Sequence, residues 1–132
     1  MNEGQMNPLE IIWHNFPHCM EYRDDSFLGL MHEERRIDMD AYWKLEWAVV
    51  QLTQNEVDYP RHLSWPVFRV FSALMINLKA NIQPENGYKI QGFNDERSWN
   101  FTERVQMVFE GFFRGDAPDL KLAFDERNPL LE

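Results

Sequence analysis

Cysteine is almost absent from this sequence, which has only Cys19 among its 132 residues. A single cysteine cannot form a disulfide within the chain, and this is typical of proteins from a reducing compartment. No apolar run approaches the roughly 18 residues that a membrane span requires. The first ten residues have neither the basic nor the apolar stretch of a secretory signal. We therefore expect a cytoplasmic protein that does not engage the membrane.

Motifs for common catalytic and cofactor sites are also missing. The six glycines are scattered, so neither the dinucleotide-binding nor the phosphate-binding glycine loop occurs. His14, His18 and Cys19 could ligate zinc, but Pro17 interrupts their helical register and no fourth ligand is evident. The paired acidic residues are accompanied by arginines, which is typical of a solvated surface. We expect no enzyme activity, no metal and no cofactor.

Helical periodicity dominates the chain, and capping residues predict where the helices begin. Asn7 followed by Pro8 predicts a first helix, which ends near Phe16 because Pro17 disfavours helical geometry in the residue before it. Asp38 predicts the start of a second helix. Apolar residues at helical spacing follow it: Tyr42, Leu45, Val49 and Leu52.

A third helix is predicted from Ser64, with Pro66 tolerated in its first turn. We expect Pro84 and Gly87 to end it. Its expected core face is the strongest periodic pattern in the chain: Phe68, Phe71, Met75, Leu78 and Ile82. Residues 21–37, between the first two helices, are predicted to be loop with at most one short element.

A fourth helix is predicted from either Asn94 or Asn100 to Gly115. Period-two alternation over 88–93 and 119–124 predicts a small two-stranded β element. The whole chain is therefore expected to form a mainly α, single-domain bundle of about four helices.

Negative charge is concentrated in the first half of the chain. Residues 1–60 carry twelve acids and four bases, a net charge of −8, whereas residues 61–132 carry ten acids and nine bases, a net of −1. Such a field repels nucleic acid and attracts a basic protein. Four arginines of the second half are expected to pair with nearby acids such as Glu96 and Glu103: Arg61, Arg69, Arg97 and Arg104.

The acidic residues between the first two helices predict a partner-binding surface. Charged rims speed association and select partners, while buried aromatics supply binding energy. The acids expected to bind are Asp24, Asp25, Glu33, Glu34, Asp38 and Asp40, and the expected aromatic anchors are Tyr22, Trp43 and Trp47. An ordinary solubilising surface is the alternative. The surplus of aromatic residues suits a dimer as well as a partner interface, so the oligomeric state is left open.

Several segments together resemble a family of small immunity proteins found beside bacterial polymorphic toxins, including those of contact-dependent growth inhibition. The segments are NPLEIIWHNFPHCMEY, SFLGLMHEERRIDMDAYWKLEWAVVQL, SWPVFRVFSALM, and VFEGFFRGDAP followed by NPLL. The resemblance implies a protein that binds a cognate toxin domain and blocks it in the cytoplasm. Many such toxins are nucleases with basic clefts, which an acidic inhibitor can occupy. The alternative is a non-enzymatic intracellular adaptor or regulatory subunit for a basic protein.

Overall fold

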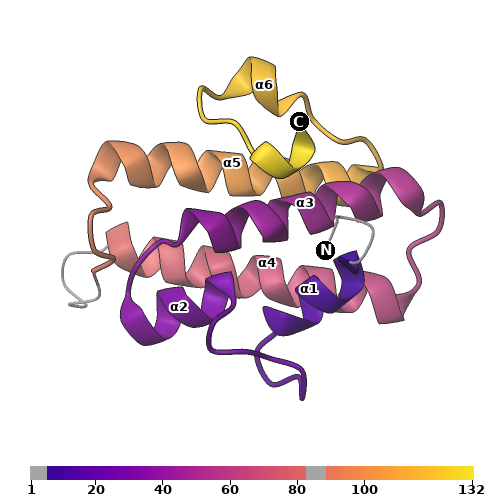
Figure 1. The fold of residues 1–132 in the computed structure, drawn as a ribbon, viewed down its shortest axis with the longest axis horizontal. Helices are drawn as coiled ribbons and strands as arrows, with labels where there is room; N and C mark the ends of the chain where they lie inside the picture. The colour runs from indigo at the N-terminus through magenta and orange to yellow at the C-terminus, as the bar shows by residue number, and fades with distance from the viewer. Residues whose placement is uncertain (1–5, 83–88) are drawn as a thin grey trace.

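Three long helices form the centre of the computed structural model, which describes residues 6–82 and 89–132 (Figure 1). α4 runs antiparallel to α3 and α5, and the short helices α1 and α2 lie on the side of α3 and α4 that faces away from α5. The elements in chain order are α1 (Pro8–His14), α2 (Phe27–Glu34), α3 (Met39–Asn55), α4 (Arg61–Ile82), α5 (Asp95–Arg114), α6 (Leu120–Ala123) and the 3₁₀ helix η3 (Pro129–Leu131). The predicted mainly α bundle is confirmed.

Side-chain caps fix most helix starts where the sequence predicts them. The side chains of Asn7, Asp38 and Asn94 accept backbone N–H groups of α1, α3 and α5 at distances of 2.8 to 3.3 Å. The start at Asn94 is therefore correct and the alternative at Asn100 is wrong. Gly115 ends α5 with a left-handed φ of 83°, a conformation that glycine adopts without strain.

Two local predictions differ from the structure. α4 begins at Arg61, and the Ser64 hydroxyl donates to the Pro60 carbonyl at 3.3 Å instead of capping the helix. The predicted β element is wrong, because residues 120–123 are helical and Gln91 pairs with Arg36 in an isolated bridge. The expected helix end at Pro84 and Gly87 lies outside the described residues. The short element within 21–37 is α2.

The buried face of α4 is rotated from the predicted one. Its fully buried residues are Val67, Val70, Leu74 and Leu78. α4 packs against α1, α2 and α5, so the arc centred on Leu74 is enclosed. Phe68, expected in the core, is instead 46 % exposed. The predicted period was correct, but more apolar residues lie on this helix than one buried arc can hold.

A buried ion pair joins α3 to α5. Arg104 donates from Nε to Glu46 Oε1 at 2.7 Å and from Nη2 to Oε2 at 2.9 Å. The side chain of Glu46 is fully buried and that of Arg104 is 5 % exposed. Burial is the largest single effect and would lower the pKa of Arg104, but the hydrogen bonds that Arg104 donates to Glu46, together with the negative charge of Glu46, raise that pKa above its usual value. The expected pairing of Arg104 with Glu96 or Glu103 is wrong, because its partner lies 58 residues away.

The segment after α6 completes this polar cluster. Asn128 donates from Nδ2 to Glu46 Oε2 at 3.1 Å and to the Trp43 carbonyl at 3.0 Å. The Arg104 guanidinium lies 4.8 Å from the Trp43 ring centroid and 5.3 Å from that of Phe124, within cation–π range of both. Residues 124–131 are thereby fixed across α3 and α5.

Candidate protein-binding surface

The first two acidic residues of the predicted surface are held beside α2 by packing at Gly29. A Cβ at Gly29 would lie 2.5 Å from the backbone oxygens of Arg23 and Asp24, so only glycine permits this approach. The Ser26 hydroxyl donates to the Arg23 carbonyl at 2.8 Å and accepts the Gly29 N–H at 3.0 Å, which caps α2. The chain therefore presents Asp24 and Asp25 at the start of α2.

Half of the six predicted carboxylates are paired with arginine. Arg23 holds Asp25 through two hydrogen bonds of 2.8 and 2.9 Å, and this lowers the pKa of the Asp25 carboxyl. Arg36 lies between Glu34, at 2.6 Å, and Asp38, at 3.2 Å. Asp38 also caps α3. These three carboxylates are partly neutralised and stabilise the local fold.

The other three carboxylates, Asp24, Glu33 and Asp40, are exposed and have no lysine or arginine within ion-pair distance among the described residues. The nearest cationic group to Glu33 is His32, at 3.8 Å. Partial burial raises the pKa of the Tyr22 hydroxyl, and the charges of Asp24 and Glu33 raise it further. The structure thus brings Tyr22, Asp24 and Glu33 together, while Asp40 lies in the first turn of α3.

A groove of about 550 Å³ lies between α2 and α4 beside these residues. Tyr22 and Glu33 line it, so two of the sequence-predicted binding residues face the same hollow. The other lining residues are Pro17, His18, Leu28, His32, Arg69, Ser72, Ala73, Ile76 and Asn77. Its surface is both apolar and charged, a combination that suits a protein partner.

Two of the predicted aromatic anchors are core residues. Trp43 is 8 % exposed and Trp47 is 7 % exposed, so neither is available to a partner in this conformation. The exposed large apolar residues of α4 are instead Trp65, Phe68 and Ile76, which sequence reasoning missed. The excess of apolar residues around α4 was a signal that this helix has a second apolar face.

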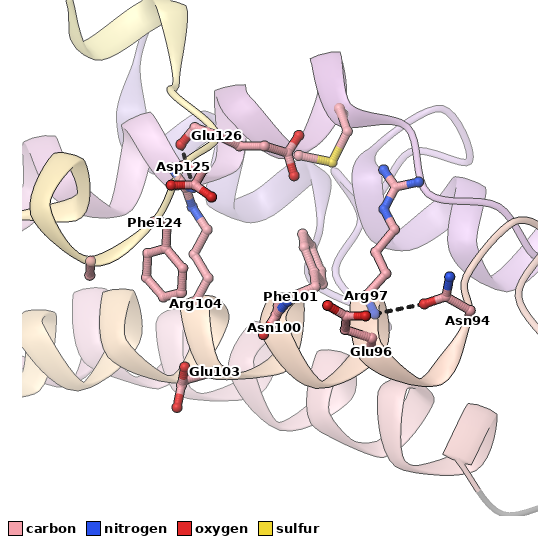
Figure 2. A pocket seen from close by; sticks show the side chains of 12 residues that line it. Asn94, Glu96, Arg97, Asn100, Phe101, Glu103, Arg104, Phe124, Asp125 and Glu126 are labelled. Atoms are coloured by element: carbon pink, nitrogen blue, oxygen red, sulfur yellow. Dashed lines mark hydrogen bonds between the residues drawn. The ribbon is translucent and has the colours of Figure 1, made fainter.

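A second hollow, of about 510 Å³, lies between α5 and the segment before η3 (Figure 2). Figure 2 shows Arg104 reaching from α5 toward Glu126, with the Phe124 ring beside it; Arg104 Nη1 donates to the Glu126 carbonyl at 2.8 Å. Charges of both signs line this hollow, including Arg97 and Asp125. Because Arg104 is bound to Glu46, the charged lining that remains is one arginine, Arg97, and four acids: Glu96, Glu103, Asp125 and Glu126.

The histidine and cysteine cluster considered for zinc does not gather into a metal site. No group of three or more His, Cys, Asp or Glu side chains within residues 6–82 and 89–132 is placed to hold a metal ion. The Cys19 thiol donates to Glu21 Oε1 at 2.8 Å. His18 has a left-handed φ of 71°, which breaks the helical register between it and His14.

Comparisons with known proteins do not place the chain in a family. In the part of the chain that the structure describes, no helix has the length and apolar character to cross a bilayer. No family model, no curated protein and no solved structure matches the chain.

Proposed function

We propose that this protein is an immunity protein that binds a cognate bacterial toxin domain and neutralises it by stoichiometric contact. The proposal rests on the exposed carboxylates of Asp24, Glu33 and Asp40, which have no arginine or lysine within ion-pair distance among the described residues. The resemblance of four sequence segments to immunity proteins supports it. The expected partner is a basic nuclease domain, whose substrate cleft attracts carboxylates.

The distribution of arginine pairs supports Asp24 and Glu33 as the acids that bind the partner. Asp25 already accepts two hydrogen bonds from Arg23, so the positive charge of that arginine weakens the attraction of Asp25 for a basic cleft. Glu33 and Tyr22 line the groove, and the charges of Asp24 and Glu33 both act on the Tyr22 hydroxyl. Their placement beside Tyr22 provides an acidic rim around an apolar contact, which favours both fast association and specificity.

The test is co-expression with the protein encoded immediately upstream, followed by measurement of the association rate for purified proteins. Asp24→Lys with Glu33→Lys changes the net charge from −9 to −5 without touching a helix cap. We expect association about tenfold slower than for the unaltered chain at low salt, and weaker protection of cells. Asp38→Lys is avoided because loss of the α3 cap would cost about 1 kcal/mol of stability.

The matched control is Glu110→Lys with Asp116→Lys, two exposed acids near the end of α5 that give the same net charge. Equal slowing by both double variants would show that net charge acts rather than this surface. An upstream protein that is neither toxic nor bound would overturn the immunity function and favour the adaptor.

A further inference from the structure

We infer that the hollow between α5 and residues 123–126 is a docking site for a basic protein segment, which places an arginine or lysine side chain in it. This site lies apart from the acidic surface beside α2, because α1 and α2 lie on the side of α3 and α4 that faces away from α5 (Figure 1). It is therefore a second binding site, in addition to the one in the proposed function. Three features of the hollow support it: apolar lining, unpaired acids, and walls that are held together.

Apolar side chains from three parts of the chain line the hollow. Phe101 of α5 is buried, and Phe124 and Met39 are half-buried where they pack against the core. Ala123 lies beside them. Lysine and arginine bury their methylene stems along apolar surface of this kind while the charged end stays at a polar edge. The lining therefore suits the stem of a basic side chain.

Carboxylates from both walls of the hollow surround this apolar lining. Glu96 and Glu103 come from α5, and Asp125 and Glu126 come from the segment before η3. All four residues are exposed. None of their carboxylates lies within ion-pair distance of a lysine, arginine or histidine among the described residues. Their charges are therefore available to a cation from another molecule.

Arg104, one of the two arginines of the hollow, is already engaged within the fold. It donates from Nε and Nη2 to the Glu46 carboxylate and from Nη1 to the Glu126 carbonyl. Its charge is balanced by Glu46, so it does not neutralise the acids of the hollow.

Arg97 is the other arginine, and it lies toward one end of the hollow. Its guanidinium is 5.9 Å from the ring centroid of Phe93. Figure 2 shows Arg97 at the opposite end from Phe124 and Asp125. Four acids and one arginine thus remain as the charged lining, in a chain whose net charge is −9. Charge complementarity favours a basic occupant.

The two walls of the hollow are fixed to each other before any partner binds. The hydrogen bond of 2.8 Å from Arg104 to the Glu126 carbonyl joins the segment to α5, and Asn128 joins it to α3 through Glu46. A site that is already ordered costs less conformational entropy on binding. No three acidic, histidine or cysteine side chains of the described residues are placed to hold a metal ion. A basic side chain with an apolar stem fits this hollow better than a bare ion does.

The test is calorimetric titration of the full chain with a tetra-arginine peptide that is capped at both ends. Glu103→Gln with Asp125→Asn removes one carboxylate from each wall and should weaken binding about tenfold. The matched control is Glu110→Gln with Asp116→Asn, which changes the net charge equally at two exposed acids that do not line the hollow. The control should weaken binding less than about twofold.

Removing the opposing charge should have the reverse effect. Arg97→Gln deletes the one arginine of the hollow that has no carboxylate partner, so the peptide should bind about threefold more tightly. Arg114→Gln gives the same net charge from an exposed position at the end of α5 and should change the affinity little.

Three results would overturn the site. The first is a peptide that does not bind, and the second is equal weakening by the two pairs of acid substitutions. The third is spermidine that binds as tightly as the peptide, which would identify a small polycation as the occupant. Asp24→Asn with Glu33→Gln separates this site from the proposed toxin surface, because it should leave peptide binding nearly unchanged. Failure of toxin binding would not alter any of these titrations.

Discussion

Replacing Glu46 by glutamine should reveal how much the buried ion pair contributes to stability. Glutamine keeps the size and shape of the side chain but removes its charge. Arg104 then remains in the core, 5 % exposed, without the carboxylate that accepts its two hydrogen bonds. Arginine does not lose its proton in proteins, so the cost cannot be relieved by neutralisation.

The expected loss is large relative to the stability of a domain of this size. Breaking a buried pair by removing one partner costs about 3–5 kcal/mol. Domains of this kind have total stabilities of about 5–15 kcal/mol. For a chain of this length, that loss corresponds to a fall in melting temperature on the order of 10–20 °C. The hydrogen bond from Asn128 to Glu46 would also weaken, because its acceptor changes from a carboxylate to an amide.

Urea unfolding followed by circular dichroism measures the effect, and Glu103→Gln serves as the control. Glu103 is exposed and close to Arg104 in sequence, so its replacement should stay within about 0.5 kcal/mol. The double variant Glu46→Leu with Arg104→Met removes both charges and should recover much of the loss. A cost below about 1 kcal/mol for Glu46→Gln would refute the idea that the pair is desolvated and mutually dependent.

The remaining predictions concern Gly29 in α2 and the buried Tyr42 in α3. Gly29→Ala should lower the free energy of unfolding by about 1–3 kcal/mol, because its Cβ would meet two backbone oxygens at 2.5 Å; calorimetry of this variant measures the loss, and an unchanged melting temperature would contradict the packing. Burial, and secondarily the charge of Glu46, raises the pKa of the Tyr42 hydroxyl well above its usual range. As the pH rises, the Tyr42 hydroxyl therefore loses its proton in the unfolded chain before it does in the folded one. The contribution of the buried hydroxyl to the free energy of unfolding is complete below about pH 10 and is lost as the pH rises further. Urea midpoints measured from about pH 9 upward should therefore fall less steeply for Tyr42→Phe than for the unaltered chain. The same dependence of the midpoint on pH in both proteins would contradict this role of Tyr42.

Short-range chemistry explains which parts of the fold could be predicted. The caps at Asn7, Asp38 and Asn94 act on backbone groups within three residues, so their sequence signatures suffice. The pairing of Glu46 with Arg104 is different, because it joins residues 58 positions apart. Nothing in the neighbourhood of Arg104 distinguishes it from an arginine that pairs locally.

The candidate surface was predicted in its charges but not in its apolar contacts. The acids at 24 and 33 are exposed as expected, since carboxylates leave water only when paired. Aromatic residues have no such preference. Whether Trp43 or Trp65 faces the core depends on which helices pack against α3 and α4, and periodicity within one helix does not contain that information.

The hydrogen bonds by which Asn128 completes the polar cluster have a consequence for folding during synthesis. During synthesis, Glu46 emerges from the ribosome long before Arg104, and Arg104 before Asn128. Until residues 124–131 are available, α3 carries a carboxylate at a position that the finished fold seals from water. Dehydration of that face of α3 is therefore costly until Arg104 and Asn128 have both emerged to hydrogen-bond with Glu46.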